Sequence, residues 1–362
     1  MRTRAKIISV VGARPQFIKL APLAGALRRR FVHKIVHTGQ HFDFNMSDIF
    51  FRYLKIPKTH ANLQINGDTN GEMTGRMLAG LSGYFKKEKP DMVLVYGDTN
   101  STLAGALAAA QRQIPVGHIE AGMRSFVPDM PEEINRRLTD HISTLLFCPT
   151  PTARKNLLNE NIKQRIVIVG DLMYELLAGS QKMITENTVW LRRNNLEEKK
   201  YIYLTAHRAA NVDTDENLKK IIAIIRVIDE PVLFPVHPRT EKRLRTFRLW
   251  RELTRLKNIR PVEPLGYRDN LTAVNFARLV LTDSGGLQKE ALFLGTPVLT
   301  LRNETEWVET LKRGNYLVGL NIDKIKKQLK AKHRVRKIDF RVRRQAPSRL
   351  ITDALARFFR EC

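Results

Sequence analysis

The chain has 362 residues, 43% of them hydrophobic, so it can bury a large core and is too long for one ordinary domain. This composition excludes a disordered protein, and no apolar run approaches the ~20 residues of a membrane helix. The formal charge is +26, yet no aromatic interleaving, zinc pattern or nucleic-acid module accompanies it. We expect solvated helix faces that attract anionic substrates or, weakly, an anionic membrane surface, and no specific nucleic-acid partner.

The N-terminus superficially resembles a signal peptide, because basic residues precede an apolar run. That run covers only residues 7–11 and ends in Gly-Ala-Arg-Pro, so we interpret it as a first buried strand. The chain has two cysteines, Cys148 and Cys362, far apart in sequence. They favour a reducing cytoplasm over a disulfide framework.

Strand and helix patterns alternate along the first half. The expected strands are residues 6–11, 34–37, 92–96, 115–119, 145–148 and 166–169. The expected helices are residues 16–30, 45–54, 72–87, 101–112, 132–142 and 151–160, with residues 56–70 irregular. Strands separated by helices of this length predict a parallel sheet that is covered on both faces.

A long helical segment near residues 170–190 and a polar stretch at 192–200 lead into a second α/β unit. Its expected strands are residues 201–204, 232–236, 259–262, 279–281 and 297–301. Two parallel sheets in one chain predict a ligand cleft between them, at the carboxyl ends of the strands.

Polar clusters follow the expected strands, which supports that placement. In the first half they are Arg14, Gln40-His41, Asp98-Thr99 and Glu120. In the second half they are His207-Arg208, His237-Pro238-Arg239 and Asp283-Ser284. A random scatter would not put nearly every such cluster at the same end of its strand.

Residues 279–300, LVLTDSGGLQKEALFLGTPVLT, read as strand, small-residue turn, helix, turn and strand. Free backbone N–H groups at the start of the helix, open at Gly285 and Gly286, form a site for phosphate. Glu290 follows one to two turns later, where its carboxylate could reach ribose hydroxyls. A plain capped turn would share the Gly-Gly pair, but Glu290 favours a nucleotide diphosphate site.

Eight motifs in order together resemble the non-hydrolysing UDP-N-acetylglucosamine 2-epimerases. They are GARPQFIK at 12–19, HTGQH at 37–41, GDTNSTLAGAL at 97–107, GHIEAGMRS at 117–125, PEEINRRLTDH at 131–141, TAHR at 205–208, HPRT at 237–240 and TDSGGLQKEA at 282–291. The resemblance covers residues 12 to about 319 and is specific as a set.

The resemblance implies two Rossmann-like domains in a B-type glycosyltransferase-like architecture, with the active site in the interdomain cleft. The N-terminal domain, residues 1–170, would hold the sugar and the acid/base residues, joined by a C-terminal helix at 346–362. Residues 171–345 would form the UDP-binding domain. The family's habit also implies a homodimer.

The chemistry that the resemblance implies is elimination of UDP to a 2-acetamidoglucal, followed by proton return to the other face and re-addition of UDP. Carbon 2 of the sugar is not next to a carbonyl, so direct proton removal there is hard. The route needs carboxylate acid/base groups and cations for the diphosphate, but no metal and no nicotinamide cofactor. Consistently, the sequence has no zinc-like Cys/His cluster and no GxGxxG after the first strand.

The resemblance also implies roles for individual residues, at the positions that match the family's motifs. The implied catalytic residues are Asp98, Glu120, Glu132 and His207. The implied substrate-binding residues are Arg14, Lys19, Gln40, His41, Arg136, His207, Ser284, Gly285, Gly286 and Glu290. Structural roles compete at two of them, because Asp98 could cap the following helix and Glu132 could stabilise a helix N-terminus.

Some positions depart from the family pattern. Ala210 stands where a glutamate is usual, Lys289 replaces a frequent glutamate, and RRQAPSRL replaces the usual Tyr-Gly-Asp-Gly element. These departures concern the C-terminal closure and a regulatory site more than the catalytic set.

The substrate has alternatives. Segments such as DLMYE at 171–175 and TEWVET at 305–310 also resemble the branch that epimerises UDP-2,3-diacetamido-2,3-dideoxyglucuronate. A UDP-sugar glycosyltransferase shares the fold, but the three carboxylates and the lack of an acceptor-binding segment argue against it. Hydrolysis to free ManNAc and UDP would follow if re-addition failed.

Overall fold

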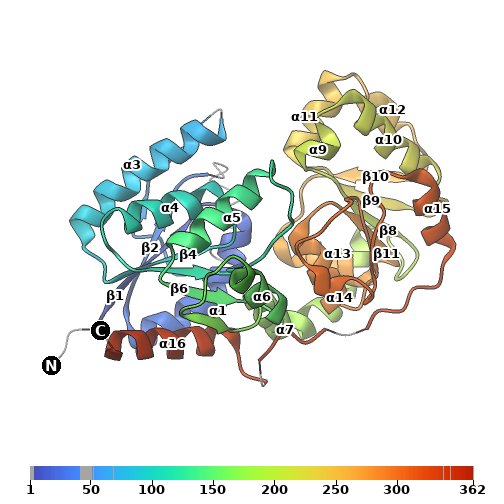
Figure 1. Ribbon diagram of the computed structural model, residues 1–362. Coiled ribbons are helices and arrows are strands. Elements are labelled where there is room, and N and C mark those ends of the chain that lie inside the picture. Colours follow the sequence, from blue (N-terminus) through green and yellow to red (C-terminus); the bar gives the residue numbers. More distant parts are fainter. Residues whose placement is uncertain are drawn as a thin grey trace. The chain divides into compact units, whose positions relative to one another are not determined.

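The computed structural model describes residues 4–40, 51, 53–67, 69–336, 338–342 and 344–361. The chain divides into two compact units (Figure 1). Unit 1 comprises Met1–Leu176 and Phe340–Cys362, and unit 2 comprises Leu177–Asp339. The helix expected at residues 45–54 lies mostly outside the described residues.

Unit 1 is built on a parallel sheet of strand order β3-β2-β1-β4-β5-β6-β7. The strands are β1 (Lys6–Val11), β2 (Val32–His37), β3 (Ala61–Asn62), β4 (Met92–Tyr96), β5 (Val116–Ile119), β6 (Leu145–Cys148) and β7 (Ile166–Ile168). The helices are α1 (Arg14–Arg30), α3 (Asn70–Glu88), α4 (Asn100–Ala110), α5 (Pro131–Ile142), α6 (Pro151–Asn159) and α16 (Pro347–Glu361). Helices α3 and α4 lie on one side of this sheet, and α1 and α16 on the other (Figure 1).

Unit 2 repeats the arrangement, with strand order β10-β9-β8-β11-β12-β13. The strands are β8 (Ile202–Thr205), β9 (Val232–Pro235), β10 (Ile259–Val262), β11 (Leu279–Thr282), β12 (Val298–Thr300) and β13 (Asn315–Leu317). The helices are α8 (Thr188–Arg193), α9 (Ala209–Val212), α10 (Asp215–Arg226), α11 (Pro238–Thr246), α12 (Trp250–Thr254), α13 (Tyr267–Phe276), α14 (Gly285–Phe293), α15 (Ile322–Lys330) and the 3-10 helix η1 (Val308–Thr310). Helix α7 (Leu172–Thr185) contains the division between the units.

The strand orders confirm the prediction of two Rossmann-like domains. In each sheet the first strand lies inside, and the chain reverses direction across the sheet between β1 and β4 or between β8 and β11. Loops that leave such neighbouring strands diverge to opposite faces, which opens a crevice at their carboxyl ends. Each unit therefore has one preferred place for a ligand.

Two edge strands escaped the sequence analysis. Residues 56–70 were expected to be irregular, but β3 pairs with β2 there, and β13 extends the unit 2 sheet beyond β12. With two and three residues, these strands are too short to produce a recognisable alternation.

The core of unit 2 shows why the apolar runs became strands. Leu279 and Leu281 pack among the apolar side chains of α10 and α15. Val280 points to the other face, among those of α13 and α14. Successive residues of a strand face opposite sides, so a strand with helices on both sides must be apolar throughout.

The C-terminal segment is part of unit 1. Phe359 of α16 packs on Phe31 at the end of α1, and Asp353 pairs with Arg30. Upstream, Ser348 donates to the Glu175 carboxylate from its backbone N at 2.8 Å and from its hydroxyl at 2.6 Å. The chain thus returns to the unit in which it began.

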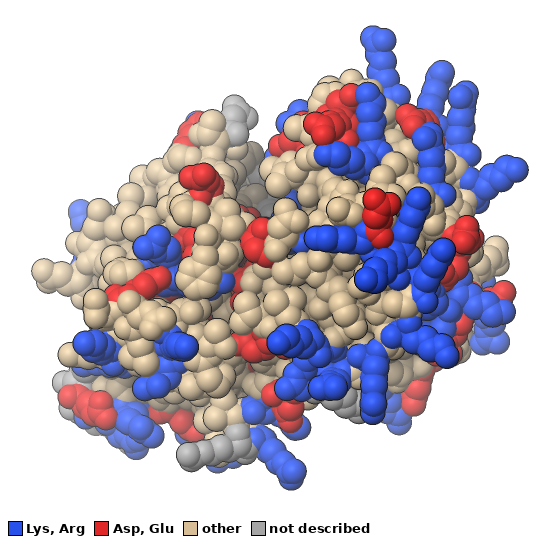
Figure 2. Space-filling view, turned by 45° about the vertical axis from the view of Figure 1, so that its right-hand side comes forward, with Lys and Arg blue, Asp and Glu red and all other residues tan. Residues whose placement is uncertain are grey.

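The excess of positive charge is the same in both units: unit 2 has 32 Lys and Arg against 19 Asp and Glu, and unit 1 has 30 against 17. Basic side chains crowd the surface of unit 2 in Figure 2. On α15, Ile325 is buried while Lys324, Lys326, Lys327 and Lys330 are exposed. The pattern is that of an amphipathic helix with a solvated basic face, as expected. Among the described residues, no helix combines the length and the apolar character of a membrane span.

A buried polar network holds the carboxyl ends of β4 and β5 together. Asp140 of α5 accepts hydrogen bonds from Arg124 Nη1 at 2.7 Å and from the backbone N of Gly122 at 3.1 Å. His118 Nδ1 lies 2.7 Å from Asp140 Oδ1, and its Nε2 lies 2.8 Å from the Gly97 carbonyl. Both groups accept, so each ring nitrogen donates.

The pKa of Asp140 follows from this setting. Burial alone would raise it, but His118 and Arg124 outweigh burial and hold the pKa below its usual range. A carboxylate with a lowered pKa adds stability above the pKa of the unfolded chain, ~3.9. That stability is lost as the pH falls through the lower folded value.

We therefore expect Asp140→Asn to destabilise the protein by about 3–5 kcal/mol at pH 7, because it removes the buried carboxylate beside His118 and Arg124 and leaves Arg124 with Glu160 as its remaining anion. Denaturant unfolding measures the difference in the free energy of unfolding between the wild type and the variant. This difference should become smaller below pH ~4, because the wild-type carboxylate is protonated there. The exposed Asp353→Asn, which breaks the pair with Arg30, is the control and should cost less than ~1 kcal/mol. Equal effects of the two variants would contradict the assigned role of the network.

Candidate active site

The crevice of unit 1 places Asp98 beside two buried residues of α5. Asp98 follows β4, and its carboxylate pairs with Arg136, whose other amine donates to Glu133 at 2.8 Å. The Arg136 side chain is 2% exposed, whereas that of Asp98 is 30% exposed. Thr99, not Asp98, is the N-cap of α4. The Asp98 carboxylate is thus partly open and not used for capping.

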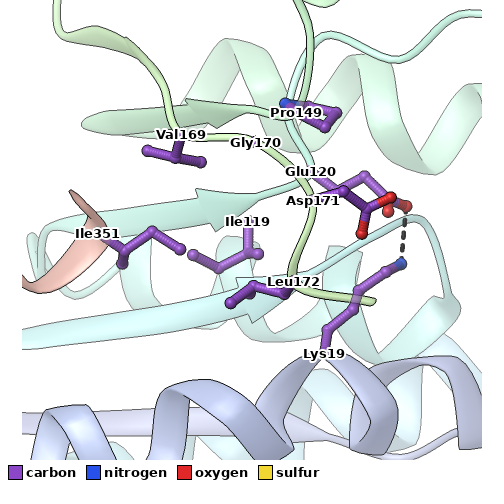
Figure 3. Close-up of a pocket in the computed structure, with 9 residues that line it drawn as sticks. All are labelled: Lys19, Ile119, Glu120, Pro149, Val169, Gly170, Asp171, Leu172 and Ile351. Atoms are coloured by element: carbon purple, nitrogen blue, oxygen red, sulfur yellow. Dashed lines mark hydrogen bonds and ion pairs between the residues drawn. The ribbon is translucent and has the colours of Figure 1, made fainter. Parts of the chain in front are cut away.

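Glu120 and Lys19 form a second ion pair at the end of β5. Lys19 Nζ donates to Glu120 Oε1 at 2.7 Å (Figure 3). Glu120 has a φ of +73°, a left-handed conformation that is uncommon outside glycine and frequent at functional sites. Gly97 has a φ of +66°, and a Cβ there would lie 2.8 Å from Lys19 Nζ. The glycine therefore makes room for the ammonium.

The Asp98–Arg136 and Lys19–Glu120 pairs are close enough for their charges to interact, because Asp98 affects the pKa of Lys19. Burial would lower the pKa of Lys19, but the charges of Glu120, Asp98 and Asp171 raise it above its ordinary value. Lys19 is therefore a buried ammonium surrounded by carboxylates.

The structure describes three of the other four expected residues of unit 1, namely Glu132, Gln40 and Arg14. Glu132 lies in the first turn of α5, half-buried, and within the described part of the chain its carboxylate makes no hydrogen bond or ion pair. Gln40 Oε1 accepts from the backbone and hydroxyl of Ser101, at 3.1 and 2.7 Å. Arg14 opens α1, directly after β1. His41 lies outside the described residues.

In unit 2, a short turn connects the end of β11 to the first turn of α14. Ser284 is the N-cap, and its hydroxyl accepts from Leu287 N at 3.4 Å. The first backbone N–H groups of a helix have no partner within it, so those of Gly285 and Gly286 are suited to an anion. A Cβ on Gly285 would lie 2.3 Å from a Glu306 oxygen, so no other residue fits there without a shift.

His207 is held by Asp283, a residue to which the sequence assigned no role. Asp283 is fully buried and accepts from the backbone N of His207 and of Arg208, each at 2.9 Å. Its Oδ1 lies 3.2 Å from His207 Nδ1. Burial would raise the pKa of Asp283, but His207 and these N–H donors lower it to about 2. A permanent carboxylate thus orients an imidazole that is 35% exposed.

Glu290, the expected ribose ligand, lies 5% exposed on α14 and accepts a hydrogen bond from Tyr267 Oη at 3.0 Å. The tyrosine belongs to the preceding helix α13 and fixes one oxygen of the carboxylate. Lys289, next to Glu290, places its ammonium 3.5 Å from the centre of the Trp307 ring. That contact gives the buried lysine a partner inside unit 2.

Sequence reasoning missed several supporting residues. Glu133 orients Arg136, Asn135 donates to the Asp98 carbonyl at 3.0 Å, and Asp171 lies close to Lys19. Their only signal in the sequence was that polar residues on α5 and directly before α7 become buried. Which of them turns toward the crevice depends on the register of α5 and α7, and no local pattern reveals that.

The arrangement supports a definite chemistry. Unit 1 offers carboxylates beside buried cations, which suits proton removal and return. Unit 2 offers a helix N-terminus, an oriented histidine and a carboxylate one turn further along, which suits a diphosphate with an attached ribose.

Comparisons with known proteins agree. A sequence model of a family described as UDP-N-acetylglucosamine 2-epimerase matches residues 25–347. A Methanococcus maripaludis protein named UDP-N-acetylglucosamine 2-epimerase homolog is 52% identical over 322 residues, 88% of this chain and 90% of that protein. The UDP-2,3-diacetamido-2,3-dideoxy-D-glucuronate 2-epimerase of Pseudomonas aeruginosa is 46% identical over 329 residues, 88% and 90% of the two chains.

A solved structure is also similar. The Methanocaldococcus jannaschii UDP-GlcNAc 2-epimerase in complex with UDP-GlcNAc and UDP aligns with a TM-score of 0.89 at 41% identity, covering 97% of this chain and 99% of that one. Sequence and structure lead to the same conclusion: the chain belongs to the UDP-N-acetylglucosamine 2-epimerase family.

Proposed function

We propose that the protein interconverts UDP-GlcNAc and UDP-ManNAc by eliminating UDP, returning a proton to the opposite face of carbon 2 and re-adding UDP. The observation that carries the proposal is the pairing of Asp98 and Glu120 with Arg136 and Lys19 at the unit 1 crevice. Inversion at carbon 2 needs one group that removes the proton and another that delivers it. Two carboxylates on neighbouring strands supply both.

The bond changes set the roles. In the first step the C2–H and C1–O bonds break, a C1–C2 double bond forms, and UDP leaves with the electron pair. Asp98, Glu120 and Glu132 are assigned the proton transfers. Glu132 fits because its half-buried carboxylate makes no hydrogen bond or ion pair to the described residues.

The leaving diphosphate is assigned to unit 2 and to the cations of unit 1. The first turn of α14, from Ser284 to Gly286, would take phosphate oxygens, and Glu290 the ribose hydroxyls. His207, oriented by Asp283, would hold the diphosphate while negative charge develops on it. Arg14, Lys19 and Arg136 add positive charge, and Gln40 and His41 are assigned to the sugar side.

A second candidate substrate is UDP-2,3-diacetamido-2,3-dideoxyglucuronate. The observation that favours it is the 46% identity to the P. aeruginosa enzyme named for that substrate. The same elimination chemistry would serve both sugars, because both carry the acetamido group at carbon 2. We place UDP-GlcNAc first. We assign the protein to the cytoplasm, which its two distant cysteines favour, and to a homodimer, which its family resemblance implies.

The substrate proposal is tested in deuterated water. Incubation with UDP-GlcNAc should place deuterium at carbon 2 of UDP-linked ManNAc, detected by NMR and mass spectrometry, without accumulation of free UDP. Exchange with the diacetamido uronate but not with UDP-GlcNAc would overturn the first choice in favour of the second. Accumulation of UDP and free ManNAc would indicate hydrolysis instead.

Asp98→Asn tests the proton chemistry. The amide cannot accept a proton, so deuterium incorporation should fall by roughly 10²–10⁴-fold while calorimetric UDP affinity stays within about threefold. Asp91→Asn is the matched control, because Asp91 lies at the opposite end of β4 and accepts from Lys6 N. Full turnover of Asp98→Asn, or equal loss in Asp91→Asn, would show that Asp98 has no catalytic role.

Asp283→Asn tests the orientation of His207. Losing the carboxylate should lower kcat by about tenfold or more, since the imidazole is no longer held by a charge. The pKa of about 2 means that the wild-type carboxylate stays ionised above pH ~4 and loses its stabilising effect only as the pH falls toward 2. The defect in kcat should therefore be constant from pH 6 to 8.

The control for this variant is Asp215→Asn, which breaks an exposed pair with Lys219 on α10. It should leave kcat unchanged. If kcat were also unchanged in Asp283→Asn, the orientation of His207 by Asp283 would have no role in the reaction.

A further inference from the structure

Three side chains of unit 1 form a chain of hydrogen bonds across the carboxyl end of β1. Thr38 Oγ1 lies 2.7 Å from Ser101 Oγ, which in turn lies 2.7 Å from Gln40 Oε1. Thr38 and Gln40 follow β2, whereas Ser101 lies in the first turn of α4, after β4. Because β1 lies between β2 and β4, the chain spans the place where the crevice of unit 1 opens.

Gly12, directly after β1, makes this crossing possible. A Cβ on Gly12 would lie 2.0 Å from Thr38 Oγ1 and 2.3 Å from Ser101 Oγ. Any other residue at this position would therefore push the two hydroxyl groups apart. Thr38 and Ser101 are both 0% exposed, so no water replaces either partner.

The chemistry of the groups fixes the direction of each hydrogen bond. The backbone N of Ser101 can only donate, and its acceptor is Gln40 Oε1 at 3.1 Å. The amide of Gln40 therefore turns its oxygen toward Ser101, because Nε2 in that place would oppose another donor. An amide oxygen carries no proton, so the Ser101 hydroxyl donates to Gln40 and accepts from Thr38. The remaining neighbour of this hydroxyl, Met77 Sδ at 3.7 Å, is a weak acceptor.

The two N–H groups of Gln40 consequently face away from α4. Gln40 is half-buried, and within the described part of the chain its only hydrogen bonds are the two that its oxygen accepts from Ser101. A side chain held by its oxygen alone presents a pair of oriented donors. Such a pair suits an oxygen of a ligand and disfavours a donor or a cation.

The first turn of α4 is itself already occupied. The backbone N of Ser101 bonds to Gln40, while those of Thr99 and Thr102 each donate to the other's hydroxyl, at 3.2 and 3.4 Å. These N–H groups would otherwise attract a phosphate. The Gln40 amide is uncharged, and Ser101 follows Asp98 by three residues at the same strand end. The donors therefore suit a neutral sugar oxygen better than the diphosphate.

We propose that Ser101 is a positioning residue, which orients the Gln40 amide so that its Nε2 donates to an oxygen of the UDP-linked sugar. Thr38 supports it by keeping the Ser101 hydroxyl turned toward Gln40. The family resemblance assigned Gln40 to the sugar side, whereas the direction of its hydrogen bonds and the roles of Thr38 and Ser101 come from the geometry. The identity of the sugar rests on the proposed function.

Gln40→Glu tests the direction of the amide. A carboxylate keeps an oxygen for both Ser101 donors and is favoured near a helix N-terminus, so the denaturant midpoint of unfolding should not change. The two N–H groups are replaced by an acceptor, which would face the sugar oxygen. Calorimetry should therefore give a Kd for UDP-GlcNAc about tenfold higher or more, and a Kd for UDP changed by less than about threefold.

Gln111→Glu is the matched control, because it makes the same change of charge at the exposed C-terminal end of α4. It should change neither Kd. An equal weakening of UDP and UDP-GlcNAc in Gln40→Glu would overturn the assignment to the sugar. Unchanged affinity for both ligands would show that the Gln40 amide has no role in binding.

A double-mutant cycle tests whether Ser101 acts through Gln40. Ser101→Ala alone should raise the Kd for UDP-GlcNAc by about fivefold, because the amide is then held by a single donor. In a Gln40→Leu background there is no amide to orient, so Ser101→Ala should add less than about twofold. Effects that multiply in the double variant would overturn the positioning role.

The outcome is separable from that of the proposed function. Absence of carbon 2 exchange in the wild type would reject the epimerisation. The calorimetric comparison needs only binding of the UDP-sugar, so it would still decide whether Gln40, oriented by Ser101, donates to the sugar.

Discussion

Buried charge at the carboxyl ends of β4 and β5 is the constraint on which unit 1 depends. Asp98, Glu120 and Asp140 are each held beside a cation that is itself almost inaccessible to water. Removing such groups from water is costly, so each must be matched by a partner at hydrogen-bonding distance. The sheet supplies the geometry, because neighbouring parallel strands bring their ends to one edge. The active site and the stability of unit 1 therefore rest on the same charges.

Unit 2 has the same kind of sheet, but its expected site is suited to binding an anion and not to proton transfer. Its expected site consists of the first turn of α14 and the Asp283–His207 pair, while the buried cations Lys289 and Arg302 contact Trp307 and Glu306. Backbone N–H groups hold an anion without a counter-charge that would have to be released again. Such a site suits a diphosphate that must stay bound while its bond to the sugar is broken, whereas proton transfer needs the titratable groups of unit 1.

Much of this was predictable from residues that signal locally. The apolar runs predicted most strands, and the polar clusters after them predicted functional residues at the carboxyl ends of the strands, because strand ends and turns are short-range features. Asp283, Glu133 and Asp171 received no role, since their meaning depends on which side chains the tertiary fold brings within reach. The edge strands β3 and β13 were missed for a related reason: two or three residues pair only because a longer strand is already there.

The return of the C-terminal segment to unit 1 has a consequence for how the protein is made. The Phe340 carbonyl packs against Gly170, and Ser348 holds Glu175, so the turn that carries Asp171 gains its support from residues near the end of the chain. Unit 2 lies between the two segments of unit 1 in the sequence. All of unit 2 is therefore synthesised before unit 1 can be completed.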